Sequence, residues 1–117
     1  MAENKDSKFT VNEIPVNLDA DCIEITTKSK ALYSLGRPDK EGWRQATKRK
    51  RKEQKDFSLK IYGVVNDDKG LRFTEFIPGI GLVQKNPTIK VGDRVVFTDR
   101  NSDFQITTYV VEIAIII

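Results

Sequence analysis

The stretch Phe57-Ser58-Leu59-Lys60-Ile61-Tyr62-Gly63-Val64-Val65 alternates apolar with polar or small residues, the pattern of a half-buried β-strand. The turn-forming residues 66–70 and a second alternating run at 71–76 follow it. These three segments predict a β-hairpin with a loop of about five residues. In this pattern Tyr62 shares a face with Val64, opposite Phe57, Leu59 and Ile61, so Tyr62 is expected to be exposed.

Similar runs lie on both sides of this hairpin. Residues 21–27 form an alternating strand, Gly92-Asp93 makes a tight turn before another strand, and 99–103 is a turn before the long apolar run 104–117. Five or six short antiparallel strands therefore predict an all-β fold, a small barrel or sandwich. We expect residues 1–10 to form a flexible polar tail and residues 11–117 a single β-barrel domain.

Composition limits the function classes. The chain has 117 residues, of which 38% are hydrophobic and 32% charged, which suits one domain with a modest core. No apolar run has the length of a transmembrane helix, so no membrane association is expected. A single cysteine, Cys22, excludes an internal disulfide and fits a reducing compartment.

The chain contains no histidine. Histidine-dependent nucleophiles, a histidine general base and histidine-containing zinc sites are therefore excluded. Asp67-Asp68, Asp93, Asp99 and Asp103 lie in predicted turns, where aspartate bonds to local backbone amides rather than to a metal. We expect a non-enzymatic protein with no cofactor, no metal and no small-molecule substrate.

Positive charge is concentrated in residues 44–55, the basic segment. It has seven cations and one acid, a net of +6, whereas the rest of the chain has 13 cations and 16 acids. Such a segment suggests contact with a nucleic-acid backbone, a nuclear address or the lining of a DNA channel, against the alternative of a solvated loop. The residues predicted to contact the anion are Trp43, Arg44, Lys48, Arg49, Lys50, Arg51, Lys52 and Lys55.

The conformation of residues 37–56, predicted as a long basic loop, is left open by the sequence. Gly36-Arg37-Pro38-Asp39 indicates a turn, and only Trp43 and Ala46 beyond it are apolar. Good helix formers allow a short helix from Asp39, but its apolar stripe is narrow. A solvated β-hairpin arm is the equal alternative.

The C-terminal run 109–117 is apolar on both faces near its end. A strand with one solvated face should alternate, so this strand is expected either to dock on another copy or another chain, or to be buried within its own subunit. The residues assigned to a partner interface are Ile113, Ile115, Ile116 and Ile117.

The order of these elements, with the turn Lys90-Val91-Gly92-Asp93-Arg94-Val95 and a closing strand at Phe104–Ile113, resembles small tailed-phage head–tail connector proteins. These are also called neck, stopper or head-completion proteins. The resemblance covers residues 20–114 and implies a structural virion protein that forms a ring, with its basic segment facing DNA. It implies location in the virion neck or the host cytoplasm.

Two alternatives to the connector interpretation stay open. The first is a module that binds single-stranded nucleic acid through an oligonucleotide-binding barrel, for which Trp43 and Tyr62 are the candidate stacking residues. The second is an inhibitor or adaptor of a host protein. Phosphate contact alone distinguishes neither RNA from DNA nor one sequence from another.

Overall fold

The computed structural model describes residues 8–66, 70–73, 76–77, 81–82, 88–101 and 103–116. The fold is all-β and its strands pair antiparallel, as the sequence predicts. The strands are β1 (Lys8–Val11), β2 (Glu13–Pro15), β3 (Cys22–Thr27), β4 (Leu32–Gly36), β5 (Trp43–Lys50), β6 (Glu53–Asn66), β7 (Gly70–Phe73), β8 (Phe76–Ile77), β9 (Gly81–Leu82), β10 (Thr88–Lys90), β11 (Arg94–Thr98), β12 (Phe104–Ile106) and β13 (Val110–Ile116).

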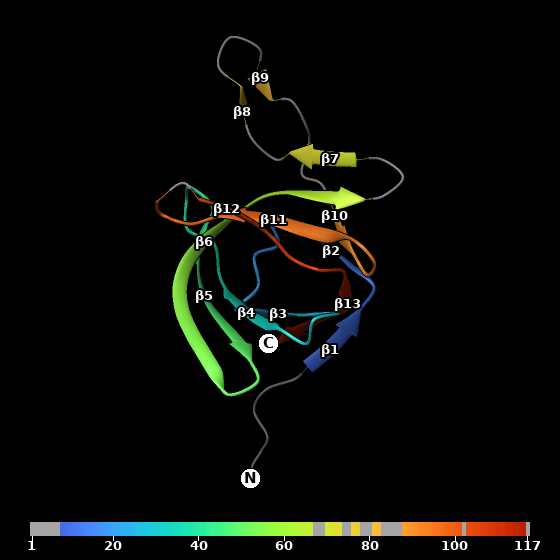
Figure 1. The fold of residues 1–117 in the computed structure, drawn as a ribbon. Helices are drawn as coiled ribbons and strands as arrows, with labels where there is room; N and C mark the ends of the chain where they lie inside the picture. Colours follow the sequence, from blue (N-terminus) through green and yellow to red (C-terminus); the bar gives the residue numbers. More distant parts are fainter. Residues whose placement is uncertain are drawn as a thin grey trace.

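Nine of these strands form one sheet, which curves around the core (Figure 1). Its order is β1-β13-β3-β4-β5-β6-β11-β12, with β7 also paired to β6. The amide of Gly92 bonds to the carbonyl of Val110 (2.8 Å) and the amide of Val110 to the carbonyl of Asp93 (2.8 Å), which draws the two halves of the sheet together. In the described residues β1 and β12 do not pair with each other, so the barrel is not closed.

The core lies on the inner face of this sheet. The predicted alternation of β3 is confirmed, because Ile23, Ile25 and Thr27 are all buried. The same inward face continues across neighbouring strands, where Ile25 pairs with Ile113 on one side and with Tyr33 on the other. Paired residues of antiparallel strands share a face, and this register therefore places the apolar side chains in one cluster.

A β-bulge at Tyr62 changes which residues of β6 face the core. Val96 pairs with Gly63 and Phe97 with Ile61, so Tyr62 is the extra residue on β6. The alternation shifts by one residue after the bulge, and Val64 is fully buried. The prediction that Val64 shares the face of Tyr62 is therefore wrong, and Tyr62 is half-buried.

The predicted turns at Gly92-Asp93 and at 99–103 are present. The amide of Asp93 bonds to the carbonyl of Lys90 (2.9 Å), and its carboxylate accepts from the amide of Lys90 (2.9 Å). Gly92 has a φ of 100°, a conformation that favours glycine. At the second turn, the Asp99 carboxylate accepts from the amides of Asn101 (2.8 Å) and Asp103 (3.1 Å).

Some segments differ from the prediction or lie outside the described residues. Lys8–Thr10, expected in the flexible tail, belong to β1 and pair with β13. β4 was missed, although Tyr33 and Leu35 alternate with more polar positions, and together with β5 it raises the strand number above five or six. The predicted hairpin is present as β6 and β7, but its loop residues 67–69 are not described.

Within the described residues, no helix has the length and apolarity needed to cross a membrane.

Candidate anion-binding surface

The basic segment forms most of a β-hairpin made by β5 and the first half of β6. Lys50 pairs with Glu53, which leaves Arg51 and Lys52 as a two-residue turn. Arg51 has a φ of 58°, the left-handed conformation that tight hairpin turns require. The predicted loop 37–56 and the alternative of a helix are therefore wrong, and the hairpin alternative is the one observed.

Pairing with the core sheet explains why this polar segment is extended. β5 pairs along its length with β6 and also with β4, where Arg49 lies opposite Leu32. Ala46 is buried on the inner face, opposite the partly buried Phe57. Residues 53–59 of β6 pair only with β5, so the hairpin is attached to the sheet through the pairing of β5 with β4 and through the continuation of β6 from Lys60 onward.

Two lysines lie opposite one another on the inner face of this hairpin. Lys48 pairs directly with Lys55, an arrangement of like charges that destabilises a sheet. The Lys48 Nζ lies 5.5 Å from the centre of the Tyr33 ring, and the Lys55 Nζ lies 5.7 Å from the centre of the Phe57 ring. These rings offset part of the repulsion through cation–π attraction, and they direct both ammonium groups to the same side of the hairpin.

Cross-strand hydrogen bonds hold the outer face of the hairpin. Ser58 Oγ donates to Gln45 Oε1 (2.7 Å), and Thr47 Oγ1 donates to Asp56 Oδ1 (3.0 Å). Nearer the turn, Arg49 Nε donates to Gln54 Oε1 (3.1 Å). Arg49 itself remains exposed to solvent.

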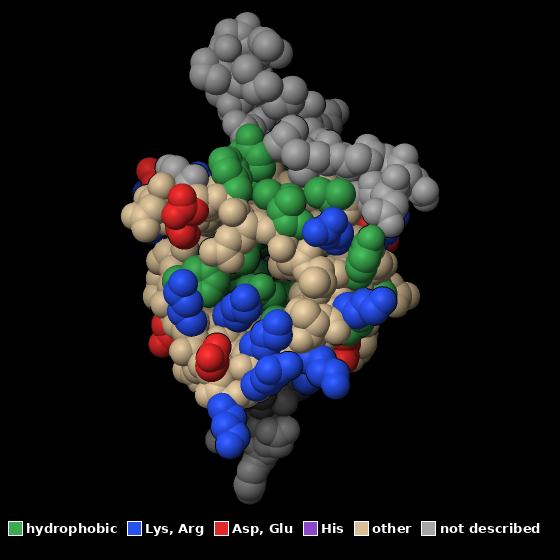
Figure 2. Space-filling model, in the orientation of Figure 1, with side chains coloured by type: hydrophobic (Ala, Val, Ile, Leu, Met, Phe, Trp, Pro, Cys, Tyr) green, Lys and Arg blue, Asp and Glu red, His purple; other side chains and the backbone are tan. Residues whose placement is uncertain are grey.

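The hairpin presents its cations to solvent. Lys48 is half-buried, whereas Arg49, Lys50, Arg51, Lys52 and Lys55 are exposed. Figure 2 shows Lys and Arg side chains gathered over the part of the molecule where the β5–β6 hairpin lies. An open hollow of about 410 Å³ lies on this hairpin, lined by Lys48, Lys50, Glu53, Gln54 and Lys55.

Arg44 is not part of this surface, and its assignment as an anion contact is wrong. Its side chain is buried, and its guanidinium donates to the carbonyls of Gly36 (2.7 Å), Val16 (3.2 Å) and Leu18 (2.8 Å). Burial lowers the pKa of Arg44, and the charge of Asp19 partly opposes that shift. Arg44 therefore connects β5 to the segment before β3.

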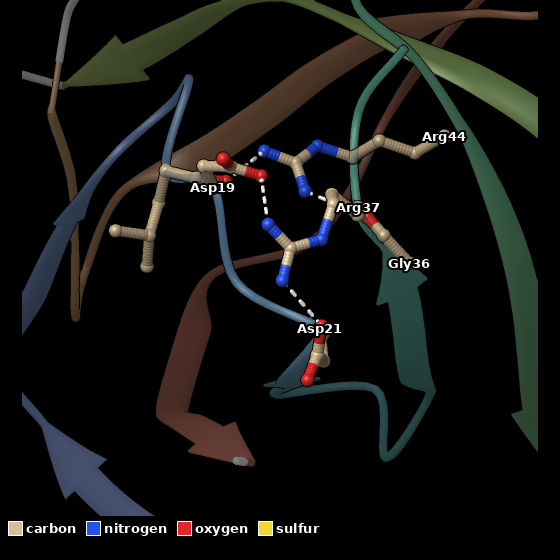
Figure 3. A network of polar contacts seen from close by, with 6 residues as sticks. Asp19, Asp21, Gly36, Arg37 and Arg44 are labelled. Atoms are coloured by element: carbon tan, nitrogen blue, oxygen red, sulfur yellow. Dashed lines mark hydrogen bonds and ion pairs between the residues drawn. The ribbon is translucent and has the colours of Figure 1, made fainter.

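A neighbouring arginine makes the exposed part of the same network (Figure 3). Arg37 bonds to the carboxylates of Asp19 (2.7 Å) and Asp21. The bond to Asp21 and the charges of both carboxylates raise the pKa of Arg37. Figure 3 shows the guanidinium groups of Arg37 and Arg44 between the 19–21 segment and the end of β4 at Gly36. The two arginines consequently have structural partners.

Trp43 contacts cations of the protein itself. The Arg100 Cζ lies 4.1 Å from the centre of its ring, and the Lys60 Nζ lies 5.2 Å from it. The turn before Trp43 is held by Asp39, whose carboxylate accepts from the amides of Trp43 (2.9 Å) and Glu41 (2.8 Å). The bond from Trp43 is the main reason why the pKa of Asp39 is lowered. The indole is thus placed beneath Arg100.

The C-terminal strand lies within the sheet. β13 pairs with β1 on one edge and with β3 on the other. Ile113 is fully buried, so its assignment to a partner interface is wrong. Ile115 is partly buried against the core and Ile116 is half-buried, whereas Ile117 lies outside the described residues. Ile113 and Ile115 therefore agree with the alternative prediction, which was burial within the same subunit.

Two exposed apolar residues of β12 were missed. Phe104 is 58% exposed and Ile106 is 53% exposed, although both belong to the apolar run 104–117. β12 is a short strand at the end of the sheet, which explains its exposure. The polar turn 99–103 directly precedes Phe104, and from it a strand near the surface could have been predicted.

Comparison with protein-family models, curated proteins and solved structures gave no match to this chain. Among the described residues, no group of three or more His, Cys, Asp or Glu side chains is arranged to hold a metal ion.

Proposed function

We propose that this chain is a non-enzymatic protein that binds the phosphate backbone of nucleic acid through its β5–β6 hairpin. The observation that carries the proposal is the unfavourable pairing of Lys48 with Lys55 at the base of an exposed cationic turn. Like charges in direct opposition cost stability unless an anion compensates them. A bound phosphate backbone supplies that compensation.

The acidic residues of the hairpin do not compensate the charges of Lys48 and Lys55. Glu53 lies opposite Lys50 at the turn, and Asp56 accepts a hydrogen bond from Thr47 on the outer face. Six cations of the hairpin remain beside these two acids when the buried Arg44 is left out. Backbone contacts of this kind give affinity without sequence preference, so binding is expected to be non-specific and strongly dependent on salt.

The resemblance to phage head–tail connectors supplies the biological setting that we propose for this binding. In that setting several copies assemble around DNA as a structural component of the virion neck, made in the host cytoplasm. The antiparallel all-β fold and the cationic hairpin are compatible with this role. No small-molecule substrate, cofactor or membrane is part of the proposal.

A second candidate function is a module that binds single-stranded nucleic acid. The exposure of Phe104, an aromatic residue on the same outer face as Lys60, favours it. Exposed aromatics next to cations are the usual means by which a sheet binds unpaired bases. Both candidate functions use the hairpin for phosphate contact.

The hairpin proposal can be tested by replacing the four lysines Lys48, Lys50, Lys52 and Lys55 with serine. Binding to a fluorescent oligonucleotide should weaken, and the slope of log affinity against log salt should become less steep by about 0.7–0.9 for each phosphate that the variant no longer neutralises. The measurement is fluorescence anisotropy at several salt concentrations. The fold should persist, which circular dichroism can check, because all four side chains are at least partly exposed.

A matched variant controls for net charge. Replacing the exposed Lys28, Lys30, Lys40 and Lys90 with serine removes the same charge from elsewhere on the surface. The proposal expects this control to keep most of the affinity and most of the salt slope. Equal losses in both variants would show that binding depends only on net charge and would contradict a site on the hairpin.

A further inference from the structure

The outer face of the sheet carries a row of four paired residues. Trp43 of β5 pairs with Lys60 of β6. Lys60 pairs with Thr98 of β11, which pairs in turn with Phe104 of β12. Because paired residues of antiparallel strands share a face, all four point outward, and at about 4.8 Å per strand the row is about 14 Å long.

Phe104 offers an aromatic surface at one end of this row. Its ring contacts the ring of Tyr62 with centres 4.8 Å apart and planes inclined by 69°. This edge-to-face contact holds the Phe104 ring in place, while 58% of the residue remains exposed. A ring that is held but uncovered loses little conformational freedom when a flat partner binds to it.

Arg100 offers a second flat surface at the other end. Its exposed guanidinium stacks over Trp43, with Cζ 4.1 Å from the ring centre. The indole covers the guanidinium on one side, and Arg100 as a whole remains exposed, so a further flat group can reach it. Guanidinium planes stack on nucleic-acid bases as aromatic rings do, and they add a positive charge.

The charges of this face suit a nucleic acid. Lys60 lies between the two flat surfaces, and Arg49 continues the same outward face toward the hairpin turn. The nearby carboxylates of Asp39 and Asp99 accept hydrogen bonds from amides of their own turns, whereas Asp103 is exposed. Asp56 also lies on this face, where it accepts from Thr47 Oγ1 (3.0 Å), so a backbone that crosses the face passes this acid before it reaches the cations of the hairpin.

We propose that the outer face of β5, β6, β11 and β12 binds single-stranded nucleic acid, with unpaired bases stacked on the ring of Phe104 and on the guanidinium of Arg100. The inference rests on the proposed function and adds the strand preference, which phosphate contacts alone do not provide. Duplex bases are already stacked on one another, so they cannot use these surfaces. Sheets with exposed aromatics bind two or three bases in this way.

Phe104→Ala tests this site in the full chain. Affinity for an oligothymidylate of about 12 nucleotides should fall about 5- to 150-fold, the loss expected for one stacked base. Affinity for a duplex of the same length should not change, and the salt slope should stay the same because the phosphate contacts are kept. Phe9→Ala is the matched control, since Phe9 is 51% exposed on β1 at the opposite end of the sheet order, and it should change neither affinity.

Arg100 allows a test that separates its flat surface from its charge. Arg100→Lys keeps the charge but removes the plane, so single-strand affinity should fall while the salt slope is preserved. Trp43 is the only tryptophan of the chain and lies under Arg100, so oligothymidylate should change its fluorescence. That change should be smaller in the Arg100→Lys variant.

The outcomes separate this site from the hairpin. If Phe104→Ala behaves like Phe9→Ala, or weakens duplex and single strand equally, the stacking site is overturned, even where the four-lysine hairpin variant still weakens binding. If the unaltered protein binds neither oligonucleotide at low salt, the proposed function fails as well. Should Phe104→Ala unfold, Phe104→Leu keeps the apolar volume without the aromatic face and must show the same selective loss.

Discussion

At the scale of single residues, Arg44 and Lys48 show how the same kind of side chain takes opposite roles on one strand. Both lie on the inner face of β5, four positions apart. Arg44 lies over the core and donates to three backbone carbonyls, whereas Lys48 lies beyond Ala46, over the Tyr33 ring and beside open solvent. Position along the strand therefore decides whether such a side chain is enclosed by backbone carbonyls or reaches solvent.

Arg44→Ala should lower the free energy of unfolding by about 3 kcal/mol or more. The substitution leaves the carbonyls of Val16, Leu18 and Gly36 without their charged donor, and it leaves a cavity where the side chain was buried. Denaturant unfolding followed by circular dichroism measures the change. The control Arg49→Ala removes an exposed arginine from the same strand and should stay within about 0.5 kcal/mol of the unaltered protein. Equal effects of the two substitutions would refute the structural role of Arg44.

At the scale of elements, β13 shows that an apolar run on both faces need not indicate an external partner. Its two edges pair with β1 and β3, and its inner face carries the buried Val110 and Ile113. Three of the four residues of β1, Lys8–Thr10, belong to the segment that was predicted to be a flexible tail. The N-terminal strand therefore covers one edge of the C-terminal strand. The neighbour that this apolar strand needs is thus a segment of the same chain.

Truncation after Glu112 should unfold the protein rather than merely prevent its association. It removes the part of β13 that pairs with both neighbours, including the fully buried Ile113. Burying one isoleucine contributes about 1.5–3 kcal/mol, and a typical domain is stable by only about 5–15 kcal/mol. Circular dichroism and thermal unfolding give the result. Val111→Thr, at a half-exposed position of the same strand, should leave the fold intact. A truncated chain that stays folded but no longer associates would instead restore the docking interpretation of this strand.

At the scale of the whole molecule, the concentrated positive charge and the end strands of the sheet lie in different parts of the fold. The basic segment of net +6 lies at one hairpin, while the rest of the chain has a net charge of −3. The ends of the nine-stranded sheet are β1 and β12, and both carry exposed apolar side chains, Phe9 on the first and Phe104 and Ile106 on the second. Since both edges of β13 are paired, the connector proposal requires contacts between copies at other surfaces of the chain.

The connector proposal predicts a species larger than the 13.3 kDa chain in sedimentation velocity. Its mass should be a multiple of that value and should persist at salt concentrations that release nucleic acid, because apolar contacts between copies are not screened by salt as phosphate contacts are. A monomer at every concentration and salt would refute the assembly. That result would leave phosphate binding by the hairpin unaffected and would favour the single-strand module.

The pattern of apolar and polar residues by itself determined that the chain is an antiparallel all-β protein. It also located the turns at Gly92-Asp93 and 99–103 and the concentration of charge at 44–55. These features depend on local preferences, such as period-2 alternation, the backbone bonds of aspartate and the conformational freedom of glycine. The hairpin at 43–60 was only one of two alternatives, because charged residues occupy both of its faces and hide the alternation.

Only the tertiary structure decided which residues of the predicted sites are free to bind. Arg44 is not free to bind an anion, because its guanidinium donates to the carbonyls of Val16 and Leu18, which are distant in sequence, and of Gly36. Ile113 is buried and cannot contact a partner, because β13 lies between two strands. Phe104 is exposed to solvent, because β12 is at the end of the sheet. Burial and partners depend on which strands become neighbours, and pairing between distant segments is not encoded in the local alternation of any one strand.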